Sequence, residues 1–181
     1  MYYILEVTPM IFAEHVKNNL FSLIREMASV PWLFSKNPAA DFSRSRKLDF
    51  ASTLQLPLSM ESGSLKKELL EYFQFSVDTP SASAFSQQRN KLLPETFPFL
   101  FYEFNSLFPF RRGYKGCRLL ACDGSDLNIT HDPKDTDTYF QNHPTDRGFK
   151  QIHLNTFYDL CEKRYTDVVI QPARKKMNPW R

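Results

Sequence analysis

The chain has 181 residues, with 23 Lys and Arg against 20 Asp and Glu and a formal net charge of +3. Hydrophobic residues make up 42% and charged residues 24%, which excludes an intrinsically disordered chain and fits one domain or two small ones. The small positive charge permits nucleic-acid binding but does not argue for it.

Nothing in the sequence indicates a membrane or secreted protein. No uncharged apolar run approaches the roughly 18–20 residues that a membrane span needs, so we expect no membrane partner. The N-terminus has no basic region, and Glu6 interrupts its apolar start, so no secretory signal is expected. The 3 cysteines form no C-x-x-C pair, and their odd number favours reduced thiols in a cytoplasmic protein.

Two helices are expected in the first part of the chain. Thr8-Pro9 predicts the start of the first, with Thr as the cap and Pro at the first helical position, and the helix should run to about Ala28. Its apolar residues recur at steps of three and four and predict one buried face: Ala13, Val16, Leu20, Leu23, Ile24 and Met27. A second, shorter amphipathic pattern begins near Leu48, and Pro57 is expected to stop it.

Three more helices follow. Ser64 is expected to cap one that carries an apolar stripe as far as Phe73. Asp78-Thr79-Pro80 predicts the start of a largely polar helix over residues 81–92. The last, from Phe97 to about Phe108, is almost wholly aromatic and is expected to be buried.

The pattern changes near Gly113, where a sheet begins. Residues 118–122 predict a short buried strand that ends at Asp123-Gly124, and residues 151–158 and 165–171 predict two more strands. The sequence therefore predicts an α+β fold, with a helical domain at residues 1–112 and a sheet domain at 113–181. Three strands without covering helices bury too little to stand alone, so the sheet domain is expected to be incomplete.

Asp123 is the sharpest candidate for chemistry. A carboxylate at the end of a strand can hold the divalent cations of a phosphoryl-transfer site. The alternative is an ordinary Asp-Gly turn after a strand. Asp126 lies three residues further on, and residues three apart on a strand point to opposite faces, so the two are not expected to share one metal.

The helical part carries a second candidate, a DNA-binding surface. The predicted helices at 64–73 and 80–92 could form a helix-turn-helix, although their connection is longer than the tight turn of that motif. The second helix would present side chains of the kinds that read bases and contact phosphates: Ser83, Gln87, Asn90 and Lys91. Further phosphate contacts are expected from Arg44, Arg46, Lys47 and Arg89. The alternative is a solvated helix face.

Several segments, taken together in their order and spacing, resemble one known family. Residues 79–92 include Ser-Ala-Phe-x-Gln-x-Arg-x-Lys, and residues 120–129 read Leu-Ala-Cys-Asp-Gly-Ser-Asp-Leu-Asn-Ile. Residues 148–160, 164–167 and 170–172 continue the pattern. The chain resembles, over most of residues 35–176, the bacterial insertion-sequence DDE transposases of the IS-four group.

The resemblance implies a fold and an activity. The family's catalytic domain is RNase H-like, and by motif Asp123 would be its first catalytic Asp and a metal ligand. Two Mg²⁺ ions, held by Asp, Asp and Glu, would support phosphodiester cleavage and strand transfer at the ends of the element. The helical part would bind double-stranded DNA at the terminal inverted repeats.

The sequence also departs from the family. The second Asp and the Glu belong to later strands, and Asp146, which precedes the second predicted strand, is assigned no catalytic role. We therefore expect a truncated transposase that is inactive in cleavage unless another chain, such as a full-length transposase, completes the fold. One alternative is a non-catalytic fragment that occupies terminal repeats or inhibits the full-length enzyme. The other is a remnant that folds poorly.

Overall fold

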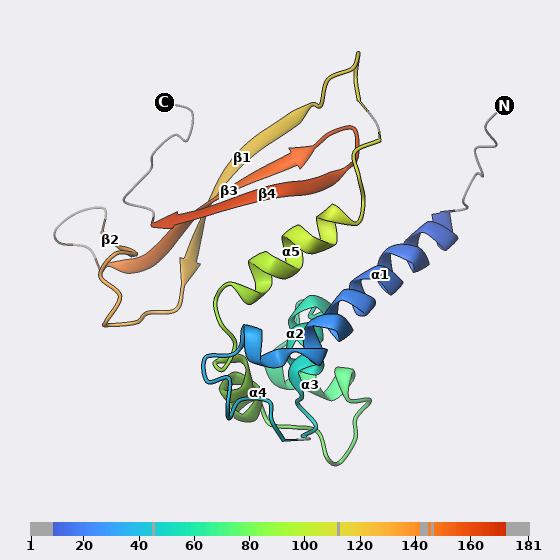
Figure 1. The fold of residues 1–181 in the computed structure, drawn as a ribbon. Coiled ribbons are helices and arrows are strands. Elements are labelled where there is room, and N and C mark those ends of the chain that lie inside the picture. Colours follow the sequence, from blue (N-terminus) through green and yellow to red (C-terminus); the bar gives the residue numbers. More distant parts are fainter. Residues whose placement is uncertain (1–8, 45, 112, 142–144, 146, 173–181) are drawn as a thin grey trace. The chain divides into compact units, whose positions relative to one another are not determined.

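The computed structural model describes residues 9–44, 46–111, 113–141, 145 and 147–172. The chain divides into two compact units, Met1–Phe108 and Pro109–Arg181, so the boundary lies close to the predicted one at residue 112. Within the described residues the first unit is helical and the second is an antiparallel sheet, which confirms the α+β class (Figure 1). The cap predicted at Thr8 lies outside the described residues.

The helical unit contains five α-helices and one short 3₁₀ helix among its described residues. Their bounds are α1 Pro9–Ser29, η1 Pro31–Phe34, α2 Phe50–Ser59, α3 Leu65–Tyr72, α4 Ala82–Arg89 and α5 Thr96–Ser106. The start and end of α1 agree with the prediction, but Ala13 is exposed, and the fully buried residues Ile24 and Met27 lie in its second half.

Side-chain caps set the starts of three of these helices. Asp49 accepts the N–H of Ser52 at 2.7 Å, Ser64 accepts that of Lys67, and Ser81 accepts that of Ala84. The cap predicted at Ser64 is confirmed. The start predicted at Asp78-Thr79-Pro80 was wrong, because Ser81 supplies the cap and the Thr79 hydroxyl donates to the Ser76 carbonyl instead.

Two predictions for the helical unit fail for physical reasons. Helix α2 continues through Pro57 to Ser59, so the helix tolerates the one hydrogen bond that proline cannot donate over its last turn. Helix α5 is not buried as a whole: Thr96 and Leu100 are buried, whereas Phe99 and Tyr102 are 42% and 46% exposed. An aromatic sequence therefore gave this helix one buried stripe and one exposed face.

Two apolar clusters form the core of this unit. The first combines Ile24, Met27, Phe50, Leu54, Leu92 and Leu100. The second combines Leu48, Leu56, Leu69 and Phe85. Helix α2 contributes to both clusters, and α1, α3, α4 and α5 pack around it or around each other.

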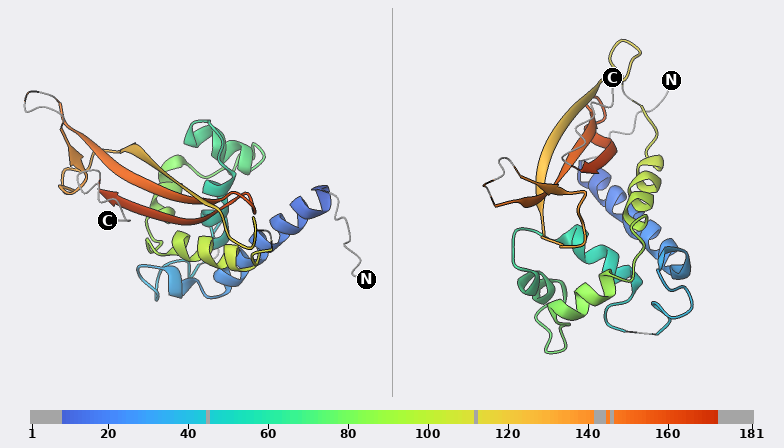
Figure 2. Two further views of the ribbon diagram at one scale, coloured as in Figure 1. Left: turned by 90° about the horizontal axis from the view of Figure 1, so that it is seen from above. Right: turned by 90° about the vertical axis from the view of Figure 1, so that its left-hand side faces the viewer.

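The sheet unit has strands β1 Leu120–Ile129, β2 Tyr139–Phe140, β3 Phe149–Asp159 and β4 Arg164–Pro172. β3 is central and pairs antiparallel with each of the others (Figure 2). The two later strands were predicted within two residues at each end, and the two-residue β2 was missed. The turn between β3 and β4, residues 160–163, lies where it was expected.

The first strand differs most from its prediction. β1 does not end at Asp123-Gly124 but runs to Ile129, and all of its residues are exposed rather than buried. Its polar residues stay in the strand because each meets a partner on β3, such as Asn128, whose Oδ1 accepts a hydrogen bond from Gln151. Asp123 therefore lies within an exposed strand, and the Asp-Gly turn is also excluded.

Candidate nucleic-acid interface

The loop that carries Arg44 and Arg46 is flanked by two apolar side chains that pack against the core, the partly buried Phe42 and the buried Leu48. Phe42 packs against the first core cluster, with its ring 5.3 Å from that of Phe50. Leu48, at the other end, is 4% exposed and belongs to the second cluster. Arg44 and Arg46, which lie between these two residues, are both exposed.

A turn at the start of this loop adds to the fixed geometry. The Asp41 carboxylate accepts the N–H of Asn37 at 3.0 Å, and the N–H of Asp41 donates to the Asn37 carbonyl at 2.8 Å. Phe42 then takes a φ of +55°, a left-handed conformation that is uncommon for a non-glycine residue. The contact between the Phe42 and Phe50 rings offsets the cost of this conformation.

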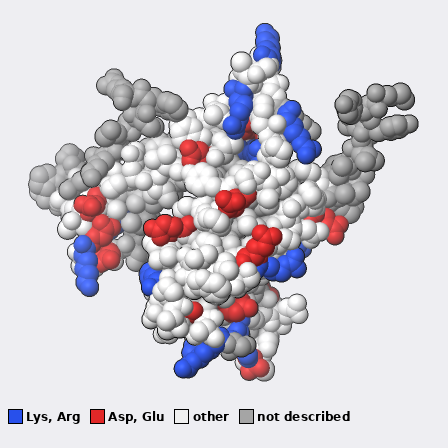
Figure 3. Space-filling view, viewed as in Figure 1, with Lys and Arg blue, Asp and Glu red and all other residues white. Residues whose placement is uncertain are grey.

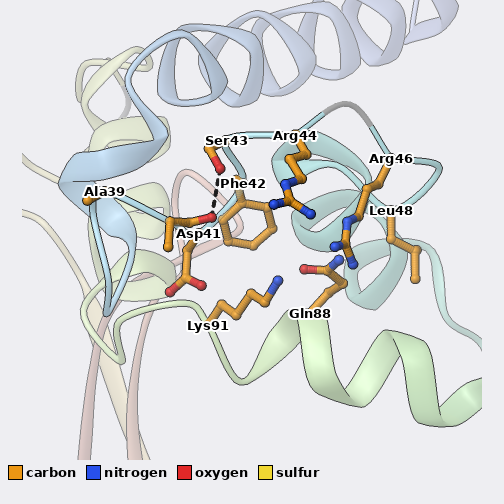
Figure 4. Close-up of a pocket in the computed structure, with 10 residues that line it drawn as sticks. Ala39, Asp41, Phe42, Ser43, Arg44, Arg46, Leu48, Gln88 and Lys91 are labelled. Carbon is orange, nitrogen blue, oxygen red and sulfur yellow. Dashed lines mark hydrogen bonds between the residues drawn. The ribbon is translucent and has the colours of Figure 1, made fainter.

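This loop and the end of α4 together enclose a polar pocket of about 430 Å³. Arg44 and Arg46 come from the loop, and Lys91 follows α4. Figure 4 shows both guanidinium groups and the Lys91 side chain reaching into the same space. The ion pairs found among the described residues include none of these three cations.

The pocket has one acidic side chain and one buried amide. The Asp41 carboxylate belongs to the lining, so the three cations exceed the carboxylate by two charges. Gln88 is 7% exposed, and its Oε1 is buried without a hydrogen-bond partner. An unsatisfied buried carbonyl oxygen carries a free-energy cost of about 1–3 kcal/mol, which a ligand with a donor group would relieve.

The other predicted DNA-binding residues lie outside this pocket. Ser83, Gln87 and Asn90 are exposed and follow helical spacing along one face of α4. Arg89 is exposed too, with its guanidinium 6.0 Å from the centre of the Phe85 ring. Ser83, Gln87 and Asn90 form a second polar surface, here called the α4 face, and Arg89 lies about one third of a turn away from it.

Lys47 has a different role from the two arginines beside it. Its Nζ lies 3.0 Å from the Asp78 carboxylate and donates to the Asp78 carbonyl at 3.1 Å. The contact ties the loop to the connection that precedes α4. That connection spans residues 73–81, longer than the three- or four-residue turn of a helix-turn-helix.

Charges of both signs lie outside the pocket. In the face shown in Figure 3, Lys and Arg are interspersed with Asp and Glu. With a net charge of only +3, attraction of a polyanion to this chain depends on local groupings of cations. The pocket at Arg44, Arg46 and Lys91 is such a grouping.

Asp123, the predicted metal ligand, lies on the other unit and has few polar neighbours. Its Oδ1 accepts the N–H of Gly124 at 2.9 Å, and Thr156 is its partner in the register of β3. Within the described residues, no group of three His, Cys, Asp or Glu side chains is placed to hold a metal ion. The described residues around Asp123 do not form a two-metal site by themselves, and this chain alone supports no catalytic step there.

Asp126 makes a separate pair on the opposite face of the sheet, as its spacing from Asp123 predicted. Its Oδ1 lies 2.6 Å from Nδ1 of His153, its partner in the register. Gly124 leaves room for the ring, because a Cβ there would lie 2.9 Å from Nε2 of His153. The pair joins β1 to β3. Asp146 lies outside the described residues.

Comparisons with models of known protein families, with curated proteins and with solved structures give no match. The resemblance to insertion-sequence transposases therefore stays a prediction that depends on the motifs of the chain itself. Among the described helices, none is both long enough and apolar enough to cross a bilayer.

Sequence reasoning named Arg44, Arg46 and Lys91 but missed Gln88, which completes the pocket. A signal for its burial was available, because Phe85, Gln88 and Leu92 follow the spacing of three and four that marks one face of a helix. Phe85 and Leu92 are both buried. The helical phase thus separates the buried Gln88 from the exposed Gln87.

Proposed function

We propose that the helical unit binds double-stranded DNA, as the end-binding part of an insertion-sequence transposase. The observation that carries the proposal is the convergence of Arg44, Arg46 and Lys91 on one pocket, from two segments distant in sequence. The α4 face, with Ser83, Gln87 and Asn90, and the exposed Arg89 beside it supply further groups that can contact bases and phosphates. The expected target is the terminal inverted repeat of the element.

The chemistry of the pocket suits a phosphate backbone. Arginine presents a planar fork of donors that fits phosphate oxygens, and lysine adds a point charge. Each phosphate that such cations neutralise releases condensed counterions, which favours binding and makes it weaken with salt. The loop holding the arginines is anchored by Phe42 and Leu48, so little ordering is needed when DNA binds.

Fluorescence anisotropy with a labelled terminal-repeat duplex tests this proposal. Replacing Arg44, Arg46 and Lys91 together with Ala should weaken binding at least roughly tenfold, since each lost contact to a charged group costs about 1.5–3 kcal/mol. A matched control replaces Lys17, Lys66 and Lys67, which lie on α1 and α3, and so removes the same charge elsewhere. Equal losses in the two variants would contradict the proposal, because binding would then depend on the net charge of the protein and not on the pocket.

A second candidate function is DNA cleavage, and the order of the strands favours it. β3 pairs antiparallel with β1 and β4, and Asp123 lies on the first strand of this sheet, which is where the resemblance puts the first catalytic Asp. We propose that Asp123 takes part in Mg²⁺-dependent cleavage only when a full-length transposase supplies the remaining carboxylates.

A single-turnover cleavage assay on terminal-repeat DNA with Mg²⁺ tests the second candidate. We expect no nicking by the chain alone. Nicking by the chain alone that disappears in Asp123→Asn would contradict the requirement for a partner. The DNA-binding proposal does not depend on this result.

A further inference from the structure

The unpartnered oxygen of Gln88 restricts what the pocket can hold. Its Oε1 is buried, has no hydrogen-bond partner and belongs to a side chain that is 7% exposed. Figure 4 shows the Gln88 amide among the polar side chains that line the pocket, and no hydrogen bond is drawn to it. A carbonyl oxygen accepts hydrogen bonds, so the group that satisfies it must be a donor.

A phosphate group alone would satisfy the cations of this pocket but not its buried carbonyl oxygen. Phosphate oxygens accept hydrogen bonds, so they can satisfy Arg44, Arg46 and Lys91 but not Oε1 of Gln88. A ligand that carries both an anionic group and an N–H donor satisfies all four side chains. A nucleotide has this combination when its base has an exocyclic amino group.

The pocket is also of a suitable size, and Gln88 is of a suitable type. Its volume of about 430 Å³ lies within the range of roughly 300–1,000 Å³ that is usual for small-molecule sites. Glutamine pairs with adenine in a bidentate manner, its oxygen accepting from the 6-amino group while its nitrogen donates to N7. Gln88 lines a pocket and is not on an open surface, so a base has to leave the stack before it can pair with the amide.

We propose that the pocket binds one unpaired adenine nucleotide of a DNA strand. Its phosphate contacts Arg44, Arg46 and Lys91, and its base pairs with the Gln88 amide. Phe42 and Leu48 supply apolar lining beside these polar groups. The inference rests on the proposed DNA-binding function and adds to it a base preference and a preference for an unpaired site.

Binding to three matched DNA probes tests the inference. The first is a hairpin duplex with one unpaired adenine, the second has an unpaired thymine at that place, and the third is fully paired. The wild-type chain should bind the first roughly five- to tenfold more tightly than the others, in line with one bidentate contact to a base. Replacing the unpaired adenine with purine lacking the 6-amino group should remove this preference without any change to the protein.

Variants complete the test. Gln88→Met keeps the size of the side chain but removes the acceptor, so it should bind all three probes alike. Its thermal unfolding is measured alongside to establish that it folds. The variant lacking Arg44, Arg46 and Lys91 should bind every probe more weakly.

The outcomes separate the two proposals. Salt-sensitive binding that depends on the three cations but is equal for adenine, thymine and paired DNA would overturn the inference, leave the proposed function standing and assign the pocket to phosphate alone. No binding to any of the probes would overturn both. A preference for adenine that survives in Gln88→Met would also overturn the inference, because another group would then read the base.

Discussion

The helical unit and the sheet unit differ in what holds them together. In the helical unit, two apolar clusters bury residues from all five α-helices or their immediate flanks. In the sheet unit, Phe157 is the one apolar side chain among the described residues that is counted as buried, beside the polar Lys150, Asn155 and Asp159. The helical unit therefore depends on packing and the sheet on ladder hydrogen bonds and a few polar contacts, so different substitutions should damage each.

The contrast extends to the surfaces that each unit leaves exposed. Beyond the polar pocket and the α4 face, the helical unit exposes scattered aromatic residues such as Phe99 and Tyr102. The sheet exposes the whole of β1, including Leu120, Leu127 and Ile129. A long exposed strand with apolar side chains is prone to associate with other strands, so the sheet unit is where we expect aggregation to begin.

The largest expected effect is the loss of a buried ring from the helical unit. Phe85 is 0% exposed, and Phe85→Ala should lower the free energy of unfolding by about 3–5 kcal/mol, because it leaves a cavity in the second cluster. Urea unfolding followed by far-ultraviolet circular dichroism measures the loss. Phe99→Ala, at a residue 42% exposed, is the matched control and should cost less than about 1 kcal/mol. Equal costs would mean that the clusters do not hold this unit together.

The next effect concerns the buried carboxylate of the sheet unit. Asp159 is 0% exposed and accepts the Nε–H of Arg118 at 3.1 Å and the N–H groups of Cys161 and Glu162 at 3.0 Å each. Asp159→Asn should cost about 2–3 kcal/mol, because these bonds to a charged acceptor are weakened or lost. Asp132→Asn, in an exposed loop, is the control and should be nearly neutral.

The Asp159 carboxylate should also make the stability of the sheet unit depend on pH. Burial acts to raise the pKa of Asp159, but the N–H of Glu162, the Arg118 guanidinium and the N–H of Cys161 outweigh it and hold the pKa below its ordinary value. The stabilisation is therefore complete above the unfolded pKa of about 3.9 and is lost as the pH falls through the lower folded pKa. Acid unfolding in that window should be blunted in Asp159→Asn. If Asp159→Asn lost as much stability on acidification as the wild type, the loss would have to come from another group.

A smaller effect is expected at Gly124, where β1 pairs with β3. A Cβ at Gly124 would lie 2.9 Å from Nε2 of His153 and 3.2 Å from Oδ1 of Asn155. Gly124→Ala should therefore cost about 1–3 kcal/mol and displace the His153 ring from Asp126. Thermal unfolding and the NMR signals of the His153 ring report the two effects. Ser125→Ala, at the next exposed position of β1, should change neither, and an unperturbed ring in Gly124→Ala would contradict the close contact.

The smallest effect should come from Lys47. Its pair with Asp78 is exposed, with 53% and 72% of the two side chains accessible, so Lys47→Ala should cost less than about 1 kcal/mol. Because Lys47 is engaged with Asp78, the substitution should also weaken DNA binding less than Arg44→Ala does. Thermal unfolding and the anisotropy assay give both numbers. A loss of binding larger than that of Arg44→Ala would restore Lys47 as a principal phosphate contact.

Sequence reasoning succeeded where one local signal decides the structure. The cap at Ser64 and the repeat of apolar residues in α1 each depend on neighbours within one or two helical turns, and both predict the observed elements. The hairpin of β3 and β4 has the same character, with alternating residues in β3 and a short turn before the β-branched residues of β4. Sequence reasoning failed for β1, because the burial of a strand depends on what covers it and not on its own residues.

The candidate site shows the same limit. Charge alone singled out Arg44, Arg46 and Lys91, but their convergence requires Phe42 and Leu48 to enter two different core clusters, which no local pattern records. By residue type alone, Gln88 does not differ from the other polar residues of α4. Only its spacing of three from Phe85 places it on the buried side of the helix. The residue types of the site were thus predictable, whereas its geometry was not.

The central claim is that three cations at one pocket bind the DNA backbone, and the salt dependence of binding tests it most directly. The slope of log K against log salt is measured for the wild-type chain between about 50 and 200 mM, where phosphate contacts weaken steeply. In the variant lacking Arg44, Arg46 and Lys91 the slope should fall by about 0.9 for each lost phosphate contact, to a total of roughly 2–3. An unchanged slope in this variant would contradict the account, because the DNA would then be held by other cations.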